Sequence, residues 1–295
     1  MEADPVETLR PLLRSLLSRD VVGFAPTTAG LTHAVTGVAR LDDGRSVFVK
    51  AGLDEHSRPQ VRTEIANLAW LGGSFMPQVL ATSLDPPVLV IEDLSRGHWP
   101  EPYPRDVSPL ESALSELRSI PVPSNHSLEM MEPPGEEILG RLVDDAGRAV
   151  PSAAGWVANH VDDIRAALES IGPATALVHS DLWYPNICFL PERVVLVDWS
   201  HLSVGSPWFD ASTVSVDLVI DGRPPLTMEE GAGWAAAHTA WVVWALAKGP
   251  APSISDPDLW TSDNLELFDG AAWWLAHELG IEPPPRVTKR AVGWM

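Results

Sequence analysis

The pattern of apolar and polar positions changes twice along the chain. Over residues 6–18, leucines recur among polar residues at helical spacing, which predicts a short leading helix. Four short β-type runs follow, with a helical repeat between the second and the third. The expected strands are 34–41, 45–51, 79–82 and 87–92, and the expected helix is 58–71. Strand, strand, helix, strand, strand describes a small α+β lobe.

A polar, proline-rich stretch at 95–104 is predicted to be a linker, and helical patterns dominate beyond it. The expected helices are 108–119, 135–149, 152–171, 228–248 and 263–280, with one β-rich interruption at 176–199. The pattern therefore predicts a bilobal α+β protein. Its β-rich N-lobe covers 1–94, and its larger, mainly helical C-lobe covers 95–295.

Composition narrows the class of protein. The 295 residues include 40 acidic and 20 basic ones, a formal net charge of −20, which argues against nucleic acid or an anionic membrane as a partner. A cationic substrate is compatible with this charge. A hydrophobic content of 45% excludes a mainly disordered chain. The single cysteine, Cys188, excludes an intrachain disulfide and a multi-cysteine zinc site.

The N-terminal residues resemble neither an export signal nor a membrane anchor. Acids occupy positions 2 and 4, and no apolar segment follows them. The longest apolar stretch, 234–247, is shorter than the ~20 residues that span a bilayer. We therefore expect a cytoplasmic protein.

The side chains best suited to chemistry lie within 176–199. An apolar strand leads into His179 and Asp181, Asn186 stands five residues after Asp181, and a second apolar strand ends at Asp198. These oxygen-bearing side chains are expected to converge at the ends of a β-hairpin. Phosphoryl transfer needs such a set: one carboxylate to accept the proton of the attacking hydroxyl, and an amide with another carboxylate to hold Mg²⁺ on ATP.

In this segment the sequence resembles the aminoglycoside phosphotransferase and choline kinase-like family, whose members have a protein kinase-like fold. The resemblance implies that Asp181 is the catalytic base, that Asn186 and Asp198 bind Mg²⁺, and that His179 supports the loop. Ser180 departs from the pattern, because the family usually has glycine there. The cofactors implied are Mg²⁺ and ATP, and the resemblance does not separate ATP from GTP.

The N-lobe carries further residues of the same pattern. Lys50 ends a strand, and in the family such a lysine contacts the α- and β-phosphates; Glu64, on the following helix, is expected to pair with it. Gly30 and Thr32 resemble the hairpin that covers the phosphates, with only one glycine remaining.

Two further segments match the family at lower specificity. Glu92, Asp93 and Leu94 resemble the hinge whose backbone contacts adenine. Asp210, in Gly-x-Pro-x-x-Asp, is expected to brace the catalytic loop without taking part in the chemistry.

The acceptor is expected to be a hydroxyl of a small molecule, with an amine-bearing antibiotic such as an aminoglycoside as the leading class. Sugars, amino alcohols and other small metabolites remain alternatives, because a shared fold does not identify a substrate. A nucleotide-binding pseudokinase without turnover is an alternative of another class. A protein kinase is disfavoured, because the interval from Asp198 to Gly205 is too short for a long activation loop. The sequence does not indicate the oligomeric state.

Thirteen tryptophans are unusual for this length. Trp234, Trp241 and Trp244 are spaced for one side of a helix, which favours core packing over an aromatic wall for a ligand. Acids nearby, such as Asp217 and Asp221, are interpreted as solvated surface rather than as partners of an amine.

Overall fold

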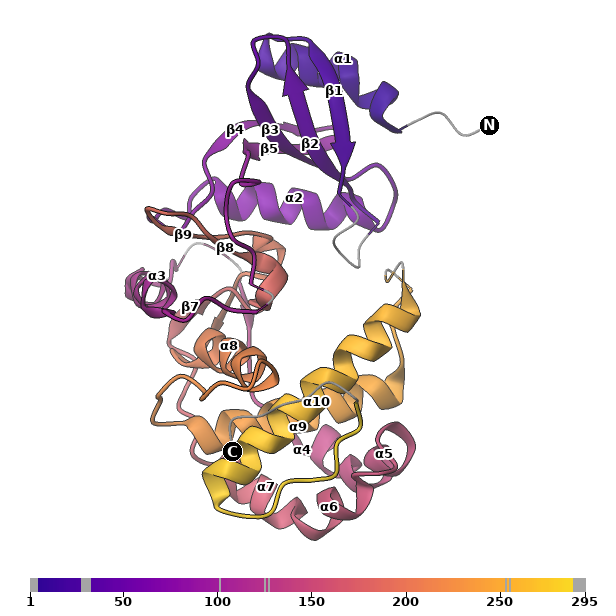
Figure 1. Ribbon diagram of the computed structural model, residues 1–295, viewed down its shortest axis with the longest axis vertical. Coiled ribbons are helices and arrows are strands. Elements are labelled where there is room, and N and C mark those ends of the chain that lie inside the picture. Colours follow the sequence, from indigo (N-terminus) through magenta and orange to yellow (C-terminus); the bar gives the residue numbers. More distant parts are fainter. Residues whose placement is uncertain are drawn as a thin grey trace. The chain divides into compact units, whose positions relative to one another are not determined.

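The computed structural model describes residues 5–27, 33–100, 102–124, 126, 128–252, 254 and 256–288 (Figure 1). The chain divides into two compact units, and each is described by itself. The first consists chiefly of the described residues within Met1–Pro100 and Pro185–His201. The second is drawn from Glu101–Tyr184, Leu202–Pro252 and Asp256–Met295.

The first unit is built on a five-stranded antiparallel sheet with the order β1-β2-β3-β5-β4. The strands are β1 (Val21–Pro26), β2 (Val35–Leu41), β3 (Ser46–Ala51), β4 (Val79–Leu84) and β5 (Pro87–Glu92). Four of them were predicted. The edge strand β1 was not, because Gly23 and Pro26 interrupt a run too short to show alternation.

Two helices pack on this sheet. Helix α1 (Pro5–Leu17) buries Leu9 and Leu13 in a cluster that includes Val47 and Val49 of β3. Side chains alternate along a strand, so Lys50 lies on the other face of the sheet from Val49. Helix α2 (Ser57–Leu68) contacts β3, β4 and β5. Both helices were predicted, and α2 ends three residues before the expected Leu71.

A separate strand pair also belongs to the first unit. Strands β8 (Ile187–Phe189) and β9 (Val194–Leu196) form an antiparallel hairpin in the segment expected to be β-rich. The backbone N–H of Leu196 donates to the carbonyl of Phe75, and the carbonyl of Phe189 accepts from the N–H of His98. These bonds attach the hairpin to segments that precede residue 100.

The second unit is mainly helical. Its helices are α3 (Ser108–Ser119), α4 (Glu136–Leu139), α5 (Leu142–Ala149), α6 (Ala154–Asn159), α7 (Val161–Leu168), α8 (Phe209–Ile220), α9 (Gly231–Lys248) and α10 (Pro257–Leu279). The predicted helix 135–149 is broken at Gly140 and Arg141, and the predicted helix 152–171 is broken at His160. Periodicity alone does not reveal such breaks, since the apolar positions stay nearly in phase across them.

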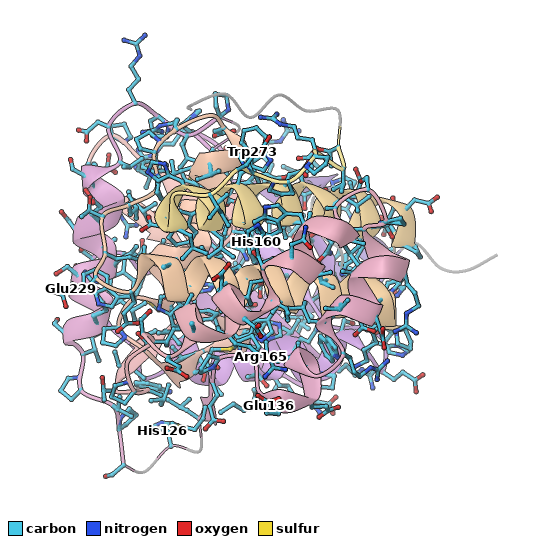
Figure 2. The ribbon with its side chains drawn as sticks, turned by 90° about the horizontal axis from the view of Figure 1, so that it is seen from below. His126, Glu136, His160, Arg165, Glu229 and Trp273 are labelled. Atoms are coloured by element: carbon cyan, nitrogen blue, oxygen red, sulfur yellow. The ribbon has the colours of Figure 1, made fainter. Side chains whose placement is uncertain are left out.

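Side-chain contacts join these short helices. The imidazole of His160 packs on Trp156 with 5.2 Å between ring centroids, and its Nδ1 lies 2.9 Å from Asp163. Arg165 of α7 forms an ion pair of 2.6 Å with Glu136 of α4. His160, Arg165 and Glu136 are labelled in Figure 2, and they link α4, α6 and α7.

Helix α8 was missed from the sequence. All of its 12 residues are buried, so it has no polar face and no amphipathic signal. It contacts α9 and α10, and the core between them contains Trp234, Phe268 and Trp274, each with no exposed surface. The prediction of core packing is therefore confirmed for Trp234.

A small sheet with the order β6-β10-β7 completes the second unit. Its strands are β6 (Glu129–Met130), β7 (Ala176–Val178) and β10 (Ser203–Gly205). β7 leads directly into His179, and β10 leads to α8, so the sheet sets the start of the predicted catalytic loop. In the described part of the chain, no helix has the length and apolar content needed to cross a membrane.

Candidate active site

Lys50 is the centre of a buried charge cluster in the first unit. Its Nζ lies 2.8 Å from Oε2 of Glu64, on α2, and 2.9 Å from Oδ2 of Asp198, which follows β9. Lys50 is 8% exposed and Glu64 4%. The expected pairing of Lys50 with Glu64 is therefore present, and the structure adds Asp198 to the pair.

The electrostatics of this cluster hold the ammonium charge in place. Burial disfavours the charged form of Lys50, but the carboxylates of Glu64 and Asp198 outweigh it and raise the pKa of Lys50 above its ordinary value. Burial raises the pKa of Glu64, and the Lys50 charge opposes that shift. A lysine kept charged in a partly dry environment is suited to binding a polyanion.

Asp198 is placed by its own backbone and by its neighbours. Its φ of 65° is left-handed, a region that a non-glycine residue enters at some cost in energy. The hydroxyl of Ser200 donates to Oδ1 of Asp198 at 2.8 Å. Trp199, fully buried, fixes the turn: its carbonyl accepts from Asn67 of α2 at 2.7 Å, and its indole N–H donates to the carbonyl of Leu196.

Asn186 and Asp198 lie at the same end of the β8–β9 hairpin. Ile187 pairs with Leu196, and the N–H of Val197 donates to the carbonyl of Asn186 at 3.0 Å. The backbone therefore brings these two residues to the same end of the hairpin, where their side chains were predicted to converge. Within the described residues, no group of three or more His, Cys, Asp or Glu side chains could hold a metal ion. An amide and a carboxylate nevertheless suit Mg²⁺, which takes oxygen ligands and usually completes its shell with water and substrate phosphates.

The predicted catalytic loop lies in the second unit, and Asp210 holds its start. The carboxylate of Asp210, at the N-terminal end of α8, accepts from the backbone N–H of His179 at 2.8 Å and of Ser180 at 3.0 Å. His179 is fully buried, and its Nδ1 accepts from the N–H of Asp181 at 3.4 Å. The contacts of His179 and Asp210 are those of loop-supporting residues, as the resemblance implied.

The backbone conformation of Ser180 shows why glycine is usual at this position. Its φ is 69°, in the left-handed region that glycine enters most easily. Its hydroxyl is buried and has no hydrogen-bond partner among the described residues. The loop therefore keeps its backbone path without glycine, at a local cost in energy.

Burial raises the pKa of Asp210 to about 6, and its bonds to the backbone of 179–180 together with the Arg118 charge oppose the shift. Arg118 stacks on the indole of Trp208, with 4.8 Å from its Cζ to the ring centroid. The two backbone N–H groups and the Arg118 charge therefore both favour the ionised form of Asp210.

Several groups of the predicted hinge already form hydrogen bonds within the first unit. The N–H of Glu92 donates to the carbonyl of Gln78 at 3.0 Å, and the carboxylate of Glu92 accepts from the N–H of Gln78 and pairs with Arg193. Asp93 accepts from the N–H of Ser95 at 2.9 Å. The N–H of Glu92 is therefore engaged within the sheet, and the predicted contact with adenine would use other backbone groups of 92–94. The predicted phosphate-covering residues Gly30 and Thr32 lie outside the described residues.

Two residues with defined contacts were not recognised from the sequence. Arg193, in the β8–β9 turn, pairs with Glu92 and donates to the carbonyls of Ser74 and Met76. Asp217 was interpreted as solvated surface, which is wrong: it is 4% exposed and accepts from the N–H of Tyr184 at 2.8 Å. Its position seven residues after Asp210 becomes a signal only once both are known to lie on α8, and that helix was missed.

Comparison with protein families assigns the chain. The profile of the phosphotransferase enzyme family matches residues 34–246, well over half of the sequence. The chain belongs to this family. The match includes Lys50, Glu64, the predicted catalytic loop and Asp198, and the resemblance to this family is confirmed. No curated protein matches this member of the family.

Solved structures share the fold. A choline/ethanolamine kinase family protein from Mesorhizobium loti is 18% identical, with a TM-score of 0.58 over 92% of this chain and 94% of that one. Choline kinase LicA from Streptococcus pneumoniae is 17% identical, with a TM-score of 0.59 over 92% and 99%. A spectinomycin phosphotransferase, solved with ADP and spectinomycin, is 13% identical, with a TM-score of 0.61 over 91% and 98%.

These likenesses confirm the predicted fold class, an α+β architecture with an N-terminal antiparallel sheet and a helical C-terminal region. At identities of 13–18%, the structural similarity establishes the fold and does not identify the acceptor substrate.

Proposed function

We propose that this phosphotransferase moves the γ-phosphoryl group of ATP to a hydroxyl of a small molecule. The observation that carries the proposal is the charged, buried Lys50, paired at 2.8 Å with Glu64 and at 2.9 Å with Asp198. A buried cation beside a carboxylate that suits Mg²⁺, with the amide-bearing Asn186 at the same end of the β8–β9 hairpin, supports a phosphate-binding role. The complex of a relative with ADP supports an adenine nucleotide.

Each residue has a proposed role. Lys50 binds phosphate oxygens, Glu64 keeps Lys50 charged and placed, and Asn186 with Asp198 holds Mg²⁺. When bound, Mg²⁺ supplies positive charge to the phosphates. Asp181 accepts the proton of the acceptor hydroxyl and orients its oxygen. Asp181 and Asn186 are five Cα–Cα steps apart, so the chain keeps their Cα atoms within about 18 Å of each other.

The leading acceptor class is an amine-bearing antibiotic such as an aminoglycoside. The net charge of −20 favours cations, and a spectinomycin phosphotransferase shares the fold. Choline kinases share it equally, so amino alcohols are the second class to test, followed by sugars.

The test is an ADP-release assay with MgATP and a panel of aminoglycosides, spectinomycin, macrolides, choline, ethanolamine and sugars, with the product identified by mass spectrometry. Asp181→Asn should abolish phosphate transfer while nucleotide affinity stays within about twofold of the wild type, since its role is confined to the acceptor. Asp162→Asn, on the exposed face of α7, is the matched control.

Near-normal turnover in Asp181→Asn would contradict the role of Asp181. A wild-type protein that binds ATP yet phosphorylates no acceptor, under conditions where a known relative is active, would favour the pseudokinase alternative.

A further inference from the structure

Helix α8 carries two buried carboxylates on one face. Asp210 and Asp217 are seven residues apart, close to two helical turns, so their side chains lie one above the other along the helix. They are 5% and 4% exposed. Both accept backbone N–H groups from the segment that contains Asp181.

The two contacts flank Asp181. Asp210 accepts from the N–H groups of residues 179 and 180, before it, and Oδ2 of Asp217 accepts from the N–H of Tyr184 at 2.8 Å, after it. A helix rises about 1.5 Å per residue, so the two carboxylates are about 10 Å apart along α8. The four-residue step from 180 to 184 reaches at most about 14 Å. The loop is therefore attached to a rigid helix at two points, with the predicted base between them.

A second hydrogen bond fixes the carboxylate of Asp217. The phenol of Tyr103, 5% exposed, donates to Oδ2 of Asp217 at 3.1 Å. Asp221, the residue that follows α8, accepts from the backbone N–H of Tyr103 at 2.9 Å. Burial and the Asp217 charge raise the pKa of Tyr103 well above its ordinary value, so the phenol remains a donor at physiological pH.

A buried carboxylate is costly unless it is hydrogen-bonded, and Asp217 meets that condition by binding the catalytic-loop backbone. We infer that Asp217 is a positioning residue: through the N–H of Tyr184 it holds the second half of the catalytic loop, and Tyr103 orients its carboxylate. This inference rests on the proposed role of Asp181. Asp217 contacts neither substrate nor nucleotide in this scheme.

Loss of the anchor should loosen the loop and misplace the base. We expect Asp217→Ala to lower kcat about 100-fold, the effect of a misplacement of about 1 Å, with KM for ATP changed less than threefold. Asp217→Asn should lose about tenfold, because a neutral amide oxygen still accepts the N–H of Tyr184 but more weakly. Tyr103→Phe leaves the hydrogen bond from the N–H of Tyr184 to Asp217 in place and should have the smallest effect on kcat.

Asp269→Asn is the matched control. Asp269, 1% exposed on α10, also accepts backbone N–H groups, those of Val287 and Thr288, each at 2.9 Å. Like Asp217, Asp269 is a buried carboxylate that accepts hydrogen bonds, but its partners lie at 287–288 and not in the catalytic loop.

The experiment combines steady-state kinetics with hydrogen–deuterium exchange of residues 182–186. Faster exchange there in the order Ala, Asn, wild type at position 217, with a parallel fall in kcat and neither change in Asp269→Asn, supports the assignment. Unchanged exchange and kcat in the Asp217 variants overturn it, as do equal losses in Asp269→Asn. If Asp217→Ala fails to fold, Asp217→Asn makes the same test with the smaller, tenfold loss expected for it.

The exchange readout needs no acceptor. If the wild type phosphorylates nothing, the proposed function fails, while faster exchange at 182–186 would still establish the anchor and unchanged exchange would refute it.

Discussion

The amine of Lys50 lies 2.9 Å from the carboxylate of Asp198, so the proposed phosphate-binding lysine and a proposed metal ligand neutralise each other in the described structure. Glu64, 2.8 Å from the same amine, balances the charge from the other side. Two carboxylates on one ammonium leave a net negative site, to which Mg²⁺ adds the positive charge that a nucleotide needs. The acidity of the whole chain is therefore no obstacle to binding ATP.

Replacing Lys50 by Met should cost both stability and activity. The substitution leaves Glu64, 4% exposed, as a buried carboxylate without its counter-charge, and breaking a buried pair in this way costs about 3 kcal/mol. We expect the free energy of unfolding, measured in urea, to fall by about that amount. Phosphate transfer should fall to background.

The double variant Lys50→Met/Glu64→Gln separates the two effects. Removing both charges should restore most of the lost stability, because the most deeply buried carboxylate is gone and only Asp198, 28% exposed, is left without its counter-charge, while activity stays at background. A double variant as unstable as Lys50→Met alone would show that the ion pair is not the source of the loss.

The sequence predicted the residues of the candidate site better than the distant contacts that hold the neighbouring backbone in place. Lys50, Glu64 and Asp198 follow apolar strands or lie on a helix with a clear repeat, so local patterns and the family order identified them. Asp217 and the pair of Arg193 with Glu92 make contacts between segments far apart in the chain. No local pattern marks which of 40 acidic residues finds such a partner.

The same reasoning explains the errors in the fold. Amphipathic helices such as α3 were predicted with correct bounds, because one face is apolar and the other is polar. Helix α8 is buried on every side, so its sequence has no contrast from which to read a period. The strands β6 and β10 were missed because they have two and three residues and are set by pairing rather than by propensity.

Ser180→Gly should stabilise the protein by about 1 kcal/mol. The substitution relieves a left-handed φ of 69° and removes a buried hydroxyl without a partner, and the extra freedom of glycine in the unfolded chain offsets part of the gain. Thermal and urea unfolding measure the change. Ser215→Gly is the contrasting variant: Ser215 is helical and buried on α8, so glycine there should destabilise. A loss of stability in Ser180→Gly would contradict the argument.

His238 should make stability fall as pH drops below about 6.5. Burial lowers the pKa of His238 to about 3, so the folded protein keeps it neutral while the unfolded chain takes up a proton near pH 6.5. Unfolding therefore becomes more favourable with acid, and between pH 7 and pH 5 this one group costs about 2 kcal/mol. Below pH 3 both states are protonated, and the dependence ends.

His238→Gln should lose this part of the pH dependence, measured as urea unfolding at pH 7 and pH 5. Ser212→Ala is the control, because the hydroxyl of Ser212 lies 2.8 Å from Nε2 of His238. It removes the hydrogen bond and keeps the imidazole, so its stability should be lower at both pH values with the slope retained. Equal slopes in His238→Gln and the wild type would refute the assignment.

Gly97 and Cys188 should show strong energetic coupling. A Cβ on Gly97 would overlap with the sulfur of Cys188, which is fully buried in a cluster with Leu94, Leu190 and Val195. Gly97→Ala is therefore expected to cost about 2 kcal/mol through overpacking. Cys188→Ala alone should cost about 1 kcal/mol, because it removes buried sulfur and leaves a small cavity.

The double variant Gly97→Ala/Cys188→Ala is expected to be more stable than the sum of the single losses predicts, because the new methyl group occupies the space that the sulfur leaves. A double-mutant cycle from urea unfolding measures this coupling, and an additive result would show that the two side chains do not meet. In the wild type, burial raises the pKa of the Cys188 thiol to about 12, so alkylation by iodoacetamide at pH 8 should be slow until the protein unfolds. Rapid alkylation of the folded protein would contradict the packing of Cys188 against Gly97.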